Sequence, residues 1–369
     1  MKLAFPYMGE GSVAYHKLAT MLGHEAVPTL KPTQKTINIG VKYAPEFACF
    51  PLKVMLGTYI EAIEQGADTI VSSGGHGPCR AGFYGELHQK VLQSLKYDVD
   101  FVIFDSVFDN PRRCIDNVKK MKGNNSFKTV IYTARTVYRS LKLMDEIEKQ
   151  LQKMRPYEAV SGTCAQIWKN LQKEIAQAYT FEAVDRLRKD TQEMVHAVEL
   201  IPVPEASRLR IGIVGEIYVV MESSVNMEME EKLLGLGCEV QRSQYLGDWV
   251  DFHLIPHRIS KPHELEIQKI GSEYFPIGIG GHARENMGWI KYFAQNGFDG
   301  VVHILPFSCL PELMSQSIIP QVSKDLNMPV ISFPMDEQSG LANNTTRIEA
   351  FIELIKAKKF GSMLTKKVV

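Results

Sequence analysis

Short apolar runs alternate with amphipathic stretches over the first third of the chain. Apolar runs at 1–8, 68–75 and 100–105 predict strands, because buried parallel strands read as nearly continuous hydrophobic segments. Apolar residues recur at helical spacing in 11–23, 52–66 and 82–97, and the first two of these stretches end on glycine. Strands that alternate with helices indicate a parallel sheet covered on both faces.

The pattern changes in the middle of the chain and then returns. The stretches 138–154, 165–179 and 181–200 are amphipathic helices with few strand signals between them, and 201–208 contains two prolines and reads as a linker. Alternation resumes with strands expected at 209–220, 238–243, 300–307 and 328–334, and with helices at 226–237, 282–297, 313–326 and 346–359. The stretch from 244 to about 276 has no regular pattern. We therefore expect an α/β protein with one lobe at 1–126, a helical segment and linker at 127–204, and a second lobe at 205–369.

Composition and charge exclude several classes of protein. The chain has 369 residues, 45% of them hydrophobic, and its 42 Lys and Arg residues balance 42 Asp and Glu residues. A broad nucleic-acid surface would need a basic excess, so no nucleic-acid partner is expected. The sequence has no apolar run long enough to span a bilayer, and 1–11 is a poor signal peptide. We expect a cytoplasmic protein.

Three of the six cysteines fall where parallel sheets bind ligands. Cys79 and Cys309 follow predicted strands, Cys49 precedes a predicted helix, and each has a proline nearby that stiffens its loop. A CxxC pair is missing from the sequence, which argues against zinc-ribbon and thioredoxin-type sites. Three thiolates that meet between two lobes would suit an iron–sulfur cluster, and three unrelated small residues in turns are the alternative. The remaining cysteines, Cys114, Cys164 and Cys238, read as small semi-buried residues.

Polar groups flank these cysteines. His76, Arg80 and His282 are candidates to donate hydrogen bonds to a cluster or to hold an anionic substrate, and Glu312 is a further candidate neighbour of the cluster. Glu46 and Arg284 are nearby in sequence. A lone histidine in an apolar strand, His303, is expected to be a hydrogen-bonded core residue. The glycine-rich stretch 278–288 lacks the phosphate-loop ending, and "SGTCAQIW" lacks a histidine at a recognisable distance, so both alternative sites are weakly supported.

The cysteine motifs carry a resemblance to a known family. The chain resembles the iron–sulfur proteins related to the 2-hydroxyacyl-CoA dehydratase subunits, and most of all their CoA-enzyme activase-related and double-cubane cluster branch. The resembling stretches run in order along nearly the whole chain: "YAPEFACFPLKVMLGTYIEAIEQGADTIVSSGGHGPCRAGFYGE", "RPYEAVSGT", "GEIYVVMESSVN", "GDWVDFHL", "IGGHARENMG", "HILPFSCLPE" and "DEQSGLANNTTRIEAF".

The resemblance implies two flavodoxin-like lobes with a cluster between them, held by Cys49, Cys79 and Cys309. It implies a separate ATP-hydrolysing iron–sulfur activase as partner, a homodimer, and a small-molecule or acyl-CoA substrate. The Asp-x-Gly phosphate loop of such an ATPase is missing from the first residues, so we expect this chain to be the electron acceptor. The cluster is either a single 4Fe-4S cubane or a bridged double cubane. An electron relay without its own substrate and a metal-free two-lobe binding protein remain alternatives.

Overall fold

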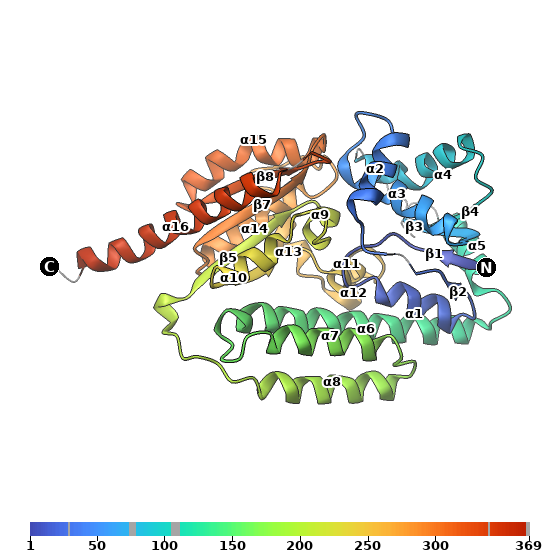
Figure 1. The fold of residues 1–369 in the computed structure, drawn as a ribbon, viewed down its shortest axis with the longest axis horizontal. Helices are drawn as coiled ribbons and strands as arrows, with labels where there is room; N and C mark the ends of the chain where they lie inside the picture. The colour runs from blue at the N-terminus through green and yellow to red at the C-terminus, as the bar shows by residue number, and fades with distance from the viewer. Residues whose placement is uncertain (29, 74–78, 105–110, 339, 367–369) are drawn as a thin grey trace.

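The protein is an α/β molecule with two parallel sheets and a helical middle segment, as the hydrophobic pattern predicts (Figure 1). The structure is a computed structural model, and it describes residues 1–28, 30–73, 79–104, 111–338 and 340–366. Within these residues each sheet has four strands, and all of the strand pairs in the two sheets are parallel. The elements fall inside the three expected ranges, and the boundaries between those ranges stay a prediction.

The first lobe contains a sheet of order β2-β1-β3-β4. Helix α3 (Phe50–Glu64) buries most of its side chains in the core of this lobe. Helix α2 (Gln34–Tyr43) packs against α3 backbone to backbone, because Gly40 and Gly57 have no side chains. A Cβ added at Gly40 would lie 1.8 Å from the carbonyl oxygen of Lys53, so only glycine fits there. The elements of this lobe are β1 (Lys2–Ala4), α1 (Val13–Met21), β2 (Glu25–Ala26), α2 (Gln34–Tyr43), α3 (Phe50–Glu64), β3 (Thr69–Ser73), α4 (Tyr84–Ser94), β4 (Asp100–Phe104) and α5 (Pro111–Lys122).

The second lobe repeats the topology of the first. Its sheet has the order β6-β5-β7-β8, which is again second-first-third-fourth, the order of a flavodoxin-like sheet. Its strands are β5 (Leu209–Gly215), β6 (Cys238–Arg242), β7 (Gly300–Pro306) and β8 (Val330–Met335). Its helices are α9 (Ile217–Met221), α10 (Met229–Gly235), α11 (Leu246–His253), α12 (His257–Ser260), α13 (Glu264–Gly271), α14 (Ala283–Gln295), α15 (Leu310–Asp325) and α16 (Leu341–Lys366).

Three helices form the middle segment and lie beneath both lobes in Figure 1: α6 (Phe127–Met154), α7 (Thr163–Ile175) and α8 (Phe181–His196). They share a core of their own, which includes Leu143, Ile147, Leu171 and Val184. The long helix α6 connects the lobes, because it packs against α1 of the first and against α11 and β6 of the second. The buried ammonium of Lys17 on α1 donates to the Ser140 hydroxyl on α6 at 2.7 Å.

Two expectations about the second lobe are wrong. The strand that starts at Leu209 ends at Gly215 and does not continue to 220, because Gly215 has a positive φ of 147° and Glu216 then caps α9. The stretch from 244 to 276 is not irregular, since it holds the short helices α11, α12 and α13. Pro256 precedes α12 and Lys261, in the left-handed conformation, ends it, and such breaks keep each helix too short to show a clear period.

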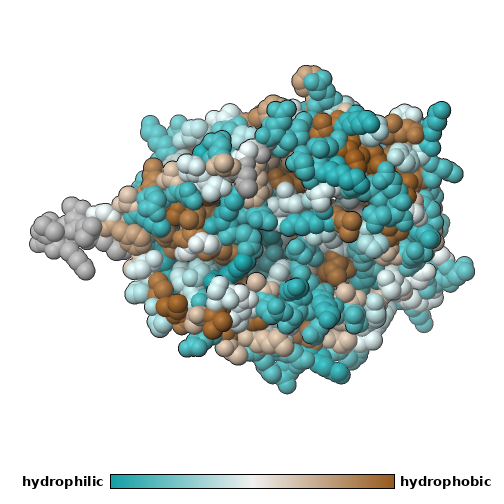
Figure 2. All heavy atoms as spheres, in the orientation of Figure 1, coloured by the Kyte–Doolittle hydropathy of each residue, from teal (hydrophilic) through white to brown (hydrophobic). Residues whose placement is uncertain are grey.

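Polar side chains cover much of the face drawn in Figure 2, and apolar side chains gather there in smaller groups. In the part of the chain that the structure describes, no helix is both long and apolar enough to span a membrane.

Candidate functional site

The carboxyl ends of the two sheets face each other, and the loops that follow the strands meet there. In each sheet the strand order reverses between the first and the third strand, and this is where doubly wound proteins bind ligands. Cys79 follows β3 in the first lobe and Cys309 follows β7 in the second. The two cysteines therefore occupy corresponding places in the repeated topology.

Contacts between the lobes hold these loops together. The Arg80 guanidinium donates to the carbonyl oxygen of Phe47 and, at 3.1 Å, to that of Ser308, so it joins the loop before Cys49 to the loop before Cys309. The backbone N–H of Gly9 donates to the buried carboxylate of Glu222 at 2.9 Å.

A further interlobe contact starts on α3. The ammonium of Lys53 lies 2.7 Å from the Glu337 carboxylate, and the Lys53 side chain is only 7% exposed. Lys53 lies one turn after Cys49, so this ion pair fixes the start of α3 against the second lobe.

Cys49, Cys79 and Cys309 have the same local position, because each is the N-cap residue at the start of a helix. Cys49 precedes α3, Cys79 precedes the 3-10 turn Arg80–Phe83, and Cys309 precedes α15. Prolines at the start of α3 and α15 preorganise those two helices and leave backbone N–H groups of the first turn directed at the cysteines. A helix start favours negative charge, so all three sulfurs occupy positions that suit a thiolate.

The three thiols lie close enough to influence one another's ionisation. The pKa of Cys79 is raised by burial, then by Glu216 and by the Cys49 thiol, and that of Cys309 is raised by burial, Glu312, Glu216 and Cys79. Burial also raises the pKa of Cys49. Backbone N–H groups of Leu52, Ala81 and Glu312 oppose these rises in part. Without a cation the three thiols stay protonated, and a bound metal would deprotonate them.

Two neighbours of the cysteines were not anticipated from the sequence. The Tyr84 hydroxyl lies 2.7 Å from Cys49 Sγ in a buried contact. Glu216 acts on all three thiols, and burial raises its own pKa. The position of Glu216 carried a signal, because it is a single carboxyl group within the apolar run 209–220. Tyr84 offered none, since its ring belongs to an ordinary amphipathic helix.

The polar residues that the sequence analysis placed beside the cysteines differ in their hydrogen-bond partners. The Glu312 side chain is completely buried and accepts hydrogen bonds from His303 Nε2 and from Asn286 Nδ2, each at 2.8 Å. His303 is therefore a hydrogen-bonded core residue, as predicted, and its other ring nitrogen contacts the Ser332 hydroxyl. The Nδ1 atom of His282 is buried and has no partner within the described residues.

The other neighbours are less central. Arg284 donates to the carbonyl oxygens of Phe275 and Pro276 and so stabilises the turn before α14. Glu46 is exposed. His76 lies outside the residues that the structure describes.

Gly281 shows how closely the second lobe approaches Cys79. A Cβ at this position would lie 3.9 Å from Cys79 Sγ and 2.8 Å from the Pro311 ring, and the φ of Gly281 is +59°. Its backbone therefore passes beside both the first-lobe cysteine and the turn that follows Cys309, which only glycine allows at that separation.

Cys114, Cys164 and Cys238 lie elsewhere. Cys164 is buried at the start of α7, and Cys238 is completely buried at the start of β6. Cys114 is partly buried on α5.

The donor set fits an iron–sulfur cluster better than a single ion. Within residues 1–28, 30–73, 79–104, 111–338 and 340–366, no three His, Cys, Asp or Glu side chains converge closely enough to hold one metal ion. In a cubane each thiolate binds a different iron atom, so the ligands stand farther apart than around one ion. Three thiols on three separate helix starts match that arrangement.

No family model matches the chain, and no curated protein matches it.

Proposed function

We propose that the protein holds an iron–sulfur cluster between its lobes on Cys49, Cys79 and Cys309, and that it accepts electrons from a separate ATP-hydrolysing partner. The system would be a low-potential reductase or resemble a 2-hydroxyacyl-CoA dehydratase. The observation that carries the proposal is that three cysteines at helix starts, two from the first lobe and one from the second, lie close enough to affect one another's ionisation. Two of them, Cys79 and Cys309, follow the third strands of the two sheets. The sequence resemblance to dehydratase-related iron–sulfur proteins supports it.

The surroundings suit the chemistry that such a cluster supplies. When bound, the cluster provides a site that takes up one electron at low potential, and its own open iron can bind a substrate oxygen. The protein contributes three thiolates, the Tyr84 hydroxyl against one of them, and a backbone approach at Gly281. The interlobe contacts of Arg80 and Lys53 keep the ligands from the two lobes at a fixed separation.

The carboxyl group of Glu216 adds a proton-handling role. Glu216 is shielded from water enough that burial raises its pKa, and it lies near all three thiols. Uptake of a proton by the Glu216 carboxylate would balance the negative charge that is added when the cluster is reduced. The pair His303 and Glu312 orients the start of α15 and therefore Cys309.

Iron and acid-labile sulfide counts on anaerobically purified protein test the proposal. About four irons per chain would indicate either one cubane in each chain or one double cubane that two chains share through six thiolates. About eight irons per chain would indicate a double cubane within each chain, for which further cysteines must bind. Protein without iron and sulfide after anaerobic purification would overturn the proposal and favour a metal-free binding protein.

A second experiment separates an enzyme from an electron relay. The pure protein is expected to release no phosphate from ATP, and an added iron–sulfur ATPase should reduce the cluster in an ATP-dependent way. A spectral change on adding an acyl-CoA to the oxidised cluster would indicate a substrate site. An unchanged spectrum with full electron uptake would indicate a relay.

The proposed assembly is a homodimer in the cytoplasm. Light scattering on the cluster-loaded protein at micromolar concentration should give twice the mass of the chain. A single-chain mass under those conditions would contradict the dimer.

A further inference from the structure

A cavity in the described part of the molecule is separate from the three candidate ligand cysteines. It has a volume of about 440 Å³ and lies where the middle helices meet both lobes. Residues 8–11 of the first lobe, α6 and α7 of the middle segment, and 220–246 of the second lobe contribute to its walls. Neither Cys49, Cys79 nor Cys309 lines it. Its size falls within the usual range for sites that bind small molecules.

Negative charge is in excess along the cavity wall. Of the charged side chains that line it, six are carboxylates and three are cations. Two of the cations are engaged already, since Arg155 pairs with Glu231 and Arg242 pairs with Glu148 and Glu230. A site of this charge attracts a cation and repels an anion.

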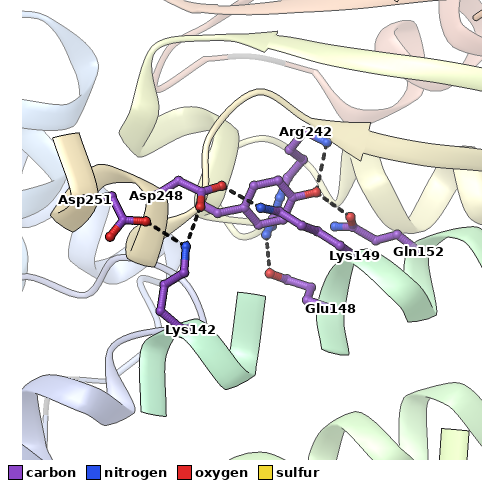
Figure 3. A network of polar contacts seen from close by, with 8 residues as sticks. Lys142, Glu148, Lys149, Gln152, Arg242, Asp248 and Asp251 are labelled. Atoms are coloured by element: carbon purple, nitrogen blue, oxygen red, sulfur yellow. Dashed lines mark hydrogen bonds and ion pairs between the residues drawn. The ribbon is translucent and has the colours of Figure 1, made fainter. Parts of the chain in front are cut away.

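Figure 3 shows the network of polar contacts beside the cavity. Its ion pairs leave the excess of negative charge on the cavity wall in place. Lys142 contacts both Asp248 and Asp251, and Lys149 also contacts Asp248. Arg242 lies over the Tyr245 ring, whose hydroxyl donates to Gln152 at 2.6 Å. Each of the three cations near Asp145, namely Lys142, Lys149 and Arg242, therefore already has carboxylate partners.

Among the described residues, Asp145 is a carboxylate of this wall that forms no ion pair. The residue is 5% exposed and lines the cavity, and within the described residues its Oδ2 atom has no hydrogen-bond partner. On the same wall Arg242 is 9% exposed, and its Nε atom is likewise without an acceptor among the described residues. A buried carboxylate without a partner is costly, so it points to a cation that the cavity receives.

The chemistry of the wall distinguishes an organic cation from a metal ion. A metal would need several converging carboxylates, and no such group of three occurs among the described residues. An ammonium group needs one carboxylate and a few acceptors. The wall also carries apolar side chains, including Leu141, Met144 and Trp168, which suit a hydrocarbon body.

We propose that this cavity binds a small aliphatic primary amine, with its ammonium on Asp145 and its hydrocarbon body against α6 and α7. The inference does not depend on the iron–sulfur proposal, because none of the three candidate ligand cysteines lines the cavity.

Proton linkage follows from the same geometry. Burial, followed by the charge of Asp248, raises the pKa of Asp145 to about 7 against the opposing effects of Lys149, Lys142 and Arg242. The adjacent Glu148 is also shifted to about 7, by burial and against the effect of Arg242. Near pH 7 a bound ammonium would ionise Asp145, so binding should release about half a proton from this carboxyl group.

Isothermal titration calorimetry on the full-length protein tests the proposal with n-hexylamine as the probe. We expect hexylamine to bind at least about tenfold more tightly than 1-hexanol or hexanoate, which share its length but carry no charge or the opposite charge. Titrations in buffers of different ionisation enthalpy should show proton release near pH 7. The diamine 1,6-diaminohexane tests whether Glu148 accepts a second ammonium.

Two variants and one control complete the design. Asp145→Asn should weaken hexylamine by about tenfold or more and remove the preference over hexanol, with no loss of fold in thermal unfolding. Ala165→Trp, at an exposed cavity position on α7, should block all probes if Asp145→Asn fails to fold. Asp190→Asn, exposed on α8, should bind as the unchanged protein does. Equal affinity for hexylamine and hexanol, or undiminished hexylamine binding by Asp145→Asn or by Ala165→Trp, would overturn the proposal.

Discussion

Nη2 of Arg80 lies 3.1 Å from the carbonyl oxygen of Ser308, and this contact joins the residue after one candidate ligand to the residue before another across the interlobe boundary. The same guanidinium also reaches the carbonyl oxygen of Phe47, two residues before Cys49. One side chain therefore ties together all three cysteine loops. We therefore expect Arg80 to matter more for the separation of the three cysteines than for the stability of the fold.

Replacing Arg80 with alanine should loosen the site without unfolding the protein. Arg80 is exposed, so the free energy of unfolding should change by less than about 1 kcal/mol. Iron release to a chelator should become severalfold faster, because two carbonyl oxygens lose their shared donor. Arg112→Ala, at another exposed arginine, is the matched control. Iron release as slow as in the unchanged protein would argue against this role.

Tyr84→Phe should lower the reduction potential of the cluster. The Tyr84 hydroxyl lies 2.7 Å from Cys49 Sγ, and a hydrogen bond to a ligand sulfur stabilises the reduced, more negative state. Its loss should shift the potential downward by on the order of tens of millivolts. Redox titration monitored by electron paramagnetic resonance measures the shift. Tyr138→Phe, on α6, is the control, and an equal shift in both variants would refute a specific effect.

Glu312→Ala should be strongly destabilising. The carboxylate is fully buried, and its removal leaves His303 Nε2 and Asn286 Nδ2 without acceptors. The expected loss in the free energy of unfolding is about 3 kcal/mol, measured by urea denaturation. Glu349→Ala, exposed on α16, should change it by less than about 0.5 kcal/mol. Similar losses in both variants would contradict the buried network.

The stability of the protein should depend on the ionisation of Asp145. Burial raises its pKa to about 7, so between about pH 4 and pH 7 the folded state binds a proton that the unfolded state has lost. This group therefore makes the fold most stable at low pH and less stable as pH rises toward 7, by at most about 1.4 kcal/mol per pH unit. Asp145→Asn removes that slope. Urea denaturation at pH 5, 6, 7 and 8 compares the two proteins, and parallel pH profiles would exclude the effect.

The fold could be predicted from hydrophobic pattern far better than the site. Buried parallel strands such as β5 and β7 are unmistakable in sequence, and the strand ends place Cys79 and Cys309 where parallel sheets generally bind ligands. The helix α2 was missed because its apolar positions are few and its packing depends on Gly40 and Gly57.

Contacts between distant segments have no local sequence signal. The pairing of Cys49 with Tyr84 depends on how α3 packs on α4, and the Glu216 carboxyl reaches first-lobe thiols only because the lobes face each other. The charge excess around Asp145 likewise arises from α6, β6 and α11 together. All three of these features depend on tertiary packing, which local sequence does not reveal.

The most direct test of the central claim is the iron and sulfide content of four cysteine variants purified without oxygen. Cys49→Ala, Cys79→Ala and Cys309→Ala should each lose the cluster, because two remaining thiolates rarely retain a cubane. Cys238→Ala, which removes a completely buried thiol at the start of β6, should keep the full content if it folds, and Cys114→Ala on α5 gives a second control. Full iron and sulfide in Cys79→Ala, together with their loss in Cys238→Ala, would contradict the assignment of the ligands.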